Sequence, residues 1–181
     1  MRKEIIQEIE IPSGIEANIS EDTITIKGTE GENKKTFRIK NIIFEKKGNK
    51  IIIGNKNSTK KEKKLTNTIT AHINNMIRGV QKKFEYKLKV VFSHFPITVE
   101  LKGNEAIIKN FLGEKTPRKC VILNGAEVKI NKDIITIKSS DREIAGQVAA
   151  NFETATRIRL RDRRVFQDGI YITDKPEREL K

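Results

Sequence analysis

Apolar and polar residues alternate with a period of two along several short segments of the chain. The segment EANISEDTITIKG, residues 16–28, has apolar residues at every second position on either side of a Glu-Asp pair. Such alternation is typical of antiparallel strands with one buried face, and the acidic pair marks a hairpin turn. The segment TVELKGNEAIIKN, residues 98–110, has the same form and turns at its Gly-Asn pair. We predict further strands at residues 36–44, 50–53, 121–123, 127–130 and 134–137.

Two other segments place apolar residues at the spacing of a helix. The first follows Ser58 and Thr59, either of which can cap a helix N-terminus. Its apolar stripe consists of Leu65, Ile69, Ile73, Met76, Ile77 and Val80. The second begins at Ser140-Asp141-Arg142-Glu143, which has the form of a capping box. Its apolar stripe consists of Ile144, Val148, Phe152 and Ala155.

The same order of elements occurs twice along the chain. A shift of 82 residues aligns Ile15 with Ile97, Ile19 with Leu101, Asp22 with Asn104, and Ile26 with Ile108. A shared period of this size indicates tandem domains descended from one unit, with chance matching among many Ile and Lys residues as the alternative. The sequence therefore predicts an α+β fold with two similar domains, each a small, mainly antiparallel sheet packed against one helix.

The boundary between the two domains is predicted from the segment FEYKLKVVFSHFPITVEL. Its strand-like alternation continues to Val90, and Pro96 follows shortly afterwards. We therefore place the first domain at residues 1–92 and the second at residues 93–181.

Composition changes this picture mainly through charge. The chain has 36% apolar and 34% charged residues, which indicates small cores beneath a charged surface. Its formal net charge of +13 favours a polyanionic partner such as nucleic acid, although a soluble protein that is merely basic would show the same value. The single cysteine, Cys120, excludes an internal disulfide and suits a reducing compartment. No segment has the roughly 20 apolar residues that span a bilayer, so we expect a cytoplasmic protein and no membrane partner.

Arginine is concentrated in one tract, although lysine is the commoner base elsewhere. The segment RIRLRDRRVFQDGIYI, residues 157–172, begins with five arginines in eight positions: Arg157, Arg159, Arg161, Arg163 and Arg164. A guanidinium group can grip phosphate with two hydrogen bonds, which lysine cannot do. Either a continued helix or an extended chain would place several of these groups in a row, and only Asp162 offsets them locally. The matching segment after the first helix, IRGVQKKFEYKLKV, has no comparable row.

A second basic tract, KNSTKKEKK at residues 56–64, lies at the start of the first helix. Its lysines are either phosphate contacts or a solvated surface, and the sequence favours neither reading. The candidate contacts are Lys60, Lys61, Lys63 and Lys64.

Candidate catalytic chemistry is sparse. The two histidines, His72 and His94, lie in different elements, and no cluster of Cys or carboxylates has metal-ligand spacing around them. The segments GTEGENKKT and LGEKT fall between strands and lack the Gly-Lys-Ser/Thr arrangement of a phosphate loop, so we interpret them as hairpin turns. We therefore predict no enzyme, no metal or cofactor, and no small-molecule substrate. Few aromatic residues, 6%, favour a structured RNA target over single strands bound by base stacking.

Three segments resemble a known family. INNMIRGV, REIAGQVAANFETATRIR and RRVFQDGIYI are similar to segments of large-subunit ribosomal protein L6 in its archaeal and eukaryotic branch. The resemblance implies a shared α/β fold for both domains and binding to large-subunit ribosomal RNA, chiefly through the C-terminal domain. It also implies a place near the stalk base and the translation-factor-binding region, beside neighbouring ribosomal proteins. It assigns RNA contacts to the five arginines and to Gln167 and Gly169, although the bacterial branch has a Gly- and Lys-rich motif where this chain has FQDGIYI.

The resulting hypothesis is a structural ribosomal protein of the cytoplasmic large subunit. A tight turn at Asp168-Gly169 is expected to bring Phe166 and Ile170 or Tyr171 into the core and to hold the arginines outward. The alternative is a free regulatory protein that binds RNA or DNA, although no helix-turn-helix, zinc finger or aromatic RNA-binding motif supports it.

Overall fold

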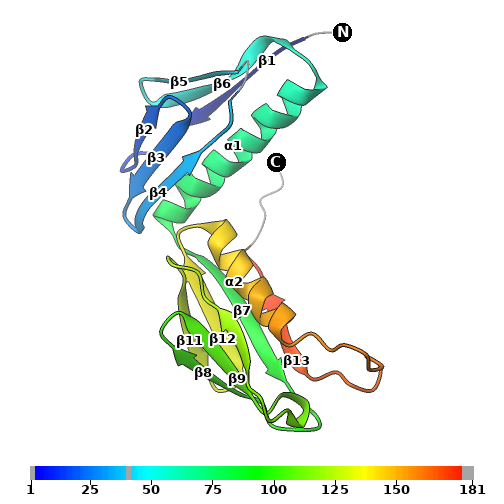
Figure 1. Ribbon diagram of the computed structural model, residues 1–181. Helices are drawn as coiled ribbons and strands as arrows, with labels where there is room; N and C mark the ends of the chain where they lie inside the picture. The colour runs from blue at the N-terminus through cyan, green and yellow to red at the C-terminus, as the bar shows by residue number, and fades with distance from the viewer. Residues whose placement is uncertain (1–2, 40–41, 177–181) are drawn as a thin grey trace. The chain divides into compact units, whose positions relative to one another are not determined.

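The computed structural model describes residues 3–39 and 42–176, which belong to two compact units (Figure 1). The first unit is formed by residues 1–83 and the second by residues 84–181. Each unit has antiparallel sheets and one α-helix that packs against them. The predicted α+β fold with two similar domains is therefore confirmed.

The first unit contains two three-stranded antiparallel sheets and helix α1. The sheet β1-β6-β5 consists of β1 (Lys3–Glu10), β6 (Lys50–Ser58) and β5 (Ile43–Lys47). The sheet β2-β3-β4 consists of β2 (Glu16–Ser20), β3 (Thr23–Gly28) and β4 (Gly31–Thr36). Helix α1 (Lys60–Gln81) contacts strands of both sheets. The alternating isoleucines of β3 and β6 meet the helix stripe in one core, in which Ile24, Ile26, Ile51, Ile53, Ile69 and Ile73 are fully buried.

The second unit repeats this arrangement and adds one strand. The sheet β10-β9-β8 consists of β10 (Arg118–Val121), β9 (Glu105–Lys109) and β8 (Thr98–Lys102). The sheet β11-β12-β7-β13 consists of β11 (Glu127–Asn131), β12 (Ile134–Ser139), β7 (Phe84–Val91) and β13 (Gly169–Asp174). A short 3-10 helix, η1 (Phe111–Gly113), precedes β10. Helix α2 (Arg142–Ala155) contacts β7, β10, β12 and β13.

Helix α2 closes the core of the second unit because one of its faces is made of small residues and two larger apolar ones. Ala145, Val148, Ala149 and Phe152 are fully buried on this face. Ile144 and Ala155, which the sequence also placed in the stripe, are only half-buried. Asp141 caps the helix by accepting a hydrogen bond from the backbone N–H of Glu143, so the helix begins one residue later than a cap at Ser140 would allow.

The predicted domain boundary differs from the one in the structure. The sequence placed residues 84–91 in the first domain, whereas β7 pairs with β12 and β13 of the second unit. Strand β7 occupies the position that β1 holds beside β6 in the first unit. Alternation shows that a segment is a strand but not which sheet it joins, and for this reason the pattern up to Val90 was assigned to the wrong domain.

Several strands also differ from the prediction. The expected strand at residues 36–44 is divided between the end of β4 and the start of β5, and residues 40–41 lie outside the described part of the chain. Strands β1 and most of β4 were not predicted. Their sequences, KEIIQEIE and GENKKT, are rich in charge because each forms the edge of its sheet. Within the described residues, no helix combines the length and the apolar character needed to cross a membrane.

Candidate nucleic-acid interface

The arginine tract lies in an irregular segment between α2 and β13. We call residues 157–168 the arginine loop. The helix ends at Ala155, with Thr156 as its C-cap, and Leu160 adopts a left-handed backbone conformation with φ of 57°. The tract therefore neither continues the helix nor forms a strand. The two geometries predicted from the sequence, a continued helix and an extended chain, are both wrong.

The start of the arginine loop is fixed by the buried hydroxyl of Thr156. Its Oγ1 donates to the carbonyl of Phe152, 3.2 Å away, and accepts from the backbone N–H of Ile170 at 2.9 Å. One side chain thus joins the end of α2 to the start of β13. Ile158 follows two residues later and is also buried, so the chain between Arg157 and Arg159 is held against the core.

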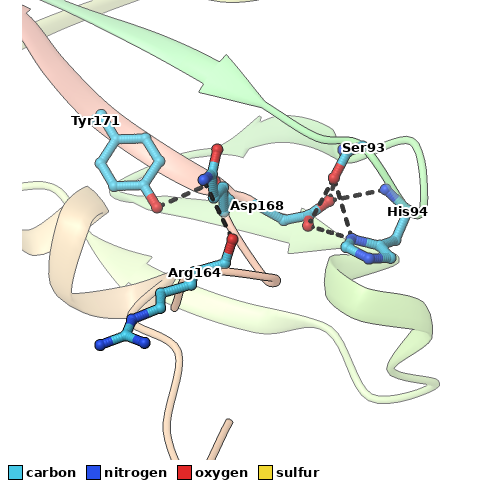
Figure 2. A network of polar contacts seen from close by, with 6 residues as sticks. Ser93, His94, Arg164, Asp168 and Tyr171 are labelled. Carbon is cyan, nitrogen blue, oxygen red and sulfur yellow. Dashed lines mark hydrogen bonds and ion pairs between the residues drawn. The ribbon is translucent and has the colours of Figure 1, made fainter. Parts of the chain in front are cut away.

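The end of the arginine loop is fixed by the polar contacts of Asp168 (Figure 2). The side chain of Asp168 is buried. Its carboxylate accepts hydrogen bonds from the backbone N–H groups of Ser93 and His94, at 2.8 and 3.1 Å. It also lies 2.6 Å from Nδ1 of His94. Burial alone would raise the pKa of Asp168, but these donors outweigh it and lower that pKa to about 2. Asp168 is therefore ionised at neutral pH and ties the loop to the segment that follows β7.

Ser93, His94 and Asp168 bring together the residue types of a hydrolytic triad, but their geometry excludes that mechanism. Both the Ser93 hydroxyl, at 3.1 Å, and the Asp168 carboxylate approach the same ring nitrogen, Nδ1 of His94. A triad requires the serine and the carboxylate on opposite nitrogens, so that a proton can pass through the ring. This network holds backbone segments together and has no arrangement for activating a nucleophile.

All five arginines of the loop are exposed. Among residues 3–39 and 42–176, no ion pair joins any of these guanidinium groups to a carboxylate. Asp162, the one acidic residue among them, accepts a hydrogen bond from the backbone N–H of Arg164 at 2.9 Å and thereby shapes the turn. The positive charge of the loop is consequently available to an external anion.

Aromatic packing gives one of these arginines a defined position. The ring of Phe166 stacks on His94 with centroids 4.9 Å apart, and the guanidinium carbon of Arg161 lies 4.9 Å from the Phe166 centroid. The contact between a guanidinium and an aromatic ring is attractive and restricts the rotamers of the arginine. Arg161 is therefore partly preorganised, whereas Figure 2 shows the Arg164 side chain pointing away from the Asp168 network.

The turn in this region lies earlier than the sequence predicted. The amides of Val165 and Phe166 both donate to the carbonyl of Asp162, so the chain reverses over residues 162–166. Gly169 is instead the first residue of β13 and is buried. A Cβ atom at Gly169 would lie 3.1 Å from the ring of Tyr171, so a larger residue would require that ring to move by a few tenths of an ångström. Ile170 enters the core as expected, and Tyr171 stays exposed.

Arg118 lies outside the tract and has a structural role that the sequence did not reveal. Its Nη1 donates to the carbonyl of Ala155 at 2.8 Å, and its Nε and Nη2 donate to the two carboxylate oxygens of Glu114. The guanidinium carbon also lies 4.2 Å from the centroid of Phe111. The hydrogen bonds from Arg118 lower the pKa of Glu114, despite the opposing effect of burial. Arg118 thus caps the C-terminus of α2 and supports the first residues of the arginine loop.

The lysine tract lies at the N-terminus of α1, in the first unit. Thr59 and Glu62 form the capping box: the backbone N–H of Thr59 donates to Glu62, and the Thr59 hydroxyl accepts from the N–H of Lys61. The candidate residues are all exposed on the first turns: Lys60, Lys61, Lys63 and Lys64. Positive charge is unfavourable beside the positive end of the helix dipole, so these lysines do not stabilise the helix.

The remaining candidates for chemistry have structural positions. Nδ1 of His72 lies 3.1 Å from Nζ of Lys35, and its ring packs near Phe37. Cys120 is buried, and burial raises the pKa of its thiol to about 11, so the adjacent basic residues do not activate it. In the described residues, no group of three or more His, Cys, Asp or Glu side chains could hold a metal ion.

The structure thus unites the five arginines and Gln167 on one loop, places Gly169 beneath Tyr171, and leaves the lysines in the other unit. Sequence reasoning missed the anchoring residues Asp168, Thr156 and Arg118. Of these three residues, only Asp168 could have been noticed in the sequence, because it is an acidic residue between a basic tract and an apolar strand. The sequence pattern predicted a turn at this position.

Comparison with known proteins agrees with the division of the chain into two similar units. A family model described as ribosomal protein L6 matches residues 11–83 and again residues 95–169. The large ribosomal subunit protein uL6 of Methanobrevibacter smithii is 43% identical over 171 residues, which cover 94% of this chain and 96% of that protein. The protein of the same name from Methanothrix thermoacetophila is 41% identical over 175 residues, covering 97% and 99%. The one from Archaeoglobus fulgidus is 42% identical over 173 residues, covering 93% and 88%.

Proposed function

The chain belongs to the ribosomal protein L6 family, and from this premise we propose that it is a structural component of the large ribosomal subunit that binds ribosomal RNA through the arginine loop. The family consists of structural ribosomal proteins and not of enzymes. Large-subunit ribosomal RNA is accordingly the proposed partner, and the cytoplasmic ribosome is the proposed location.

The observation that carries this proposal is a set of exposed guanidinium groups on a loop anchored at both ends. Thr156 and Asp168 restrain the backbone, and Arg161 is restrained further by Phe166. Preorganised groups lose less conformational entropy when they meet a ligand. Guanidinium groups match phosphate oxygens in both charge and geometry, so five of them exposed on one anchored loop suit the backbone of a folded RNA.

The proposal is tested by changing Arg159, Arg161 and Arg163 together to alanine. Binding of the full chain to deproteinised large-subunit ribosomal RNA should weaken roughly tenfold or more at physiological salt. The slope of log K against log salt should become shallower by roughly 2–3, because each of the three lost phosphate contacts removes about 0.7–0.9 from that slope.

The matched control changes Lys102, Lys119 and Lys129 to alanine. These exposed residues belong to the second unit, and their removal lowers the net charge by the same amount. The control should keep most of the affinity and slope. Equal losses in both variants would show that overall charge, and not the loop, governs binding, and would reject the proposed interface.

We further propose that the chain lies near the stalk base and the translation-factor-binding region, beside other ribosomal proteins. Support for this position comes from the family resemblance alone. Cross-linking within intact large subunits should join the arginine loop to RNA of that region. Sedimentation separates the proposal from the alternative of a free regulatory protein, which would not travel with the large subunit.

A further inference from the structure

A cavity of about 370 Å³ lies between the arginine loop, the last turn of α2 and the start of β13. Its wall includes Glu153, Arg157, Arg163, Phe166, Gln167 and Tyr171. We call it the tyrosine pocket. Its volume falls within the range of small-molecule sites, roughly 300–1,000 Å³, so it can take a ligand larger than a phosphate ion.

The pocket divides the arginines of the loop into two groups. Arg157 and Arg163 line it, whereas the other three arginines do not. Each of these two guanidinium groups has several N–H donors and a permanent positive charge, which is the chemistry that a phosphate group requires.

Tyr171 provides an aromatic wall that is fixed in place. Its hydroxyl donates to the backbone carbonyl of Gln167 at 3.1 Å, and its ring lies so close to Gly169 that an added Cβ would contact it. Nevertheless, 44% of its surface is exposed. An exposed ring held by its hydroxyl and by the backbone beneath it suits the stacking of a planar group.

Polar groups at the same cavity suit the edge of a nucleobase. Gln167 can both donate and accept hydrogen bonds through its side-chain amide. Glu153 accepts from the backbone N–H of Ile172 through Oε1 at 2.9 Å, and a carboxylate has further capacity to accept from a base N–H. A site for phosphate alone would gain nothing from a carboxylate in its wall.

We propose that the tyrosine pocket binds one unstacked nucleotide of the RNA. The phosphate lies between Arg157 and Arg163, and the base stacks on Tyr171 with its edge toward Gln167 and Glu153. RNA-binding proteins commonly recognise splayed-out bases by aromatic stacking and edge contacts. This inference rests on the proposed RNA-binding function and adds to it the form of the RNA: a bulged or looped nucleotide beside the contacted backbone.

The test titrates the full chain with the four ribonucleoside 5′-monophosphates and, separately, with inorganic phosphate, followed by NMR. At least one nucleotide should bind more tightly than phosphate and shift the signals of Tyr171 and of the Gln167 side-chain amide. Tyr171→Ala should weaken that binding roughly fivefold or more, as expected for the loss of one base-stacking contact. Tyr171→Phe keeps the ring and should keep most of the affinity.

Val165→Ala is the matched control, because Val165 is an exposed apolar residue of the same loop that does not line the pocket. It should leave nucleotide binding unchanged. Nucleotides that bind no better than inorganic phosphate, or that bind equally well after Tyr171→Ala, would overturn the pocket as a nucleotide site.

Binding to ribosomal RNA distinguishes failure of this inference from failure of the proposed function. Tyr171→Ala should lower RNA affinity at every salt concentration without changing the salt slope, since stacking releases no counterions. Unchanged RNA affinity in Tyr171→Ala, together with the expected loss in the triple arginine variant, rejects the pocket and leaves the interface intact. Absence of salt-dependent RNA binding by the unmodified chain rejects the proposed function itself.

Discussion

The two helices occupy equivalent places in the two units, but their C-termini are capped differently. In the first unit, the carbonyl of Val80 accepts hydrogen bonds from the N–H of Glu30 and the hydroxyl of Thr29, at 2.9 and 3.2 Å. Both donors come from the turn between β3 and β4. In the second unit, the carbonyl of Ala155 is capped by the guanidinium group of Arg118, on β10. A cap made by a backbone N–H and a neutral hydroxyl in one copy is thus replaced by a charged side chain in the other.

The chain also continues differently after the two helices. Lys82 and Lys83 lead directly from α1 to β7, whereas the arginine loop separates α2 from β13. Strand β13 pairs with the edge of β7, and in the described residues the equivalent edge of β1 has no additional strand. The loop and β13 are therefore additions to the repeated unit. The repeat supplies a rigid sheet and helix, and the proposed binding residues lie where the second copy departs from the first.

The largest loss of stability is expected when Asp168 is changed, because it anchors a loop that the first unit lacks. Asp168→Asn replaces an ionised acceptor of backbone N–H groups with a neutral amide, and should lower the free energy of unfolding by about 2 kcal/mol at pH 7. Because folding lowers the pKa of Asp168 to about 2, its stabilisation is present above its ordinary pKa near 4 and is lost as pH falls toward 2. The difference in unfolding free energy between the two proteins should therefore shrink over that range.

Urea unfolding of both proteins between pH 2 and 7 measures this difference. Asp162→Asn serves as the control, because Asp162 belongs to the same loop but is exposed. A difference that stays constant down to pH 2 would show that the charge of Asp168 does not anchor the loop.

An intermediate effect is expected when the two kinds of arginine in the second unit are compared. Arg118→Lys cannot reproduce the paired hydrogen bonds to Glu114 together with the bond to Ala155, and should cost about 1–2 kcal/mol of unfolding free energy. Arg159→Lys should leave stability unchanged and affect RNA binding only. Thermal unfolding checks both variants, and equal stabilities would contradict the distinction between a structural arginine and a binding arginine.

The smallest change in stability is expected for substitutions in the basic tract of the first unit. Lys60→Glu and Lys61→Glu reverse charge at the positive end of the dipole of α1, so each should stabilise the protein by about 0.3–1 kcal/mol at low salt. The gain should fade as salt is added. Lys102→Glu, on β8, is the control without a helix dipole, and calorimetry at two salt concentrations measures all three variants. Destabilisation by the helix variants would show that these lysines have a structural role.

Much of the scaffold could be predicted because its signals are local. Alternation marked β2, β3, β8, β9, β11 and β12, and the apolar stripes marked both helices. Strand β1 escaped because its exposed face carries three glutamates and one exposed isoleucine, which obscures the pattern of an edge strand. The sequence also did not predict that the arginines lie in a loop, because residue propensities do not determine where α2 ends. The helix end is fixed by the hydroxyl of Thr156 and the side chain of Arg118, which contact Ile170 and Ala155.

Residue order along the chain was enough to reveal a duplicated α+β scaffold and an unusual density of guanidinium groups, since periodicity and composition are properties of short segments. Three-dimensional packing was needed to assign β7 to the second unit, to make Asp168 a buried anchor, and to separate the arginines that line a pocket from those that do not. Each of these outcomes depends on partners many residues apart, such as Ser93 with Asp168 and Ala155 with Arg118. Such pairs meet only when the core has formed, because burial of the isoleucine-rich strands determines which distant segments become neighbours.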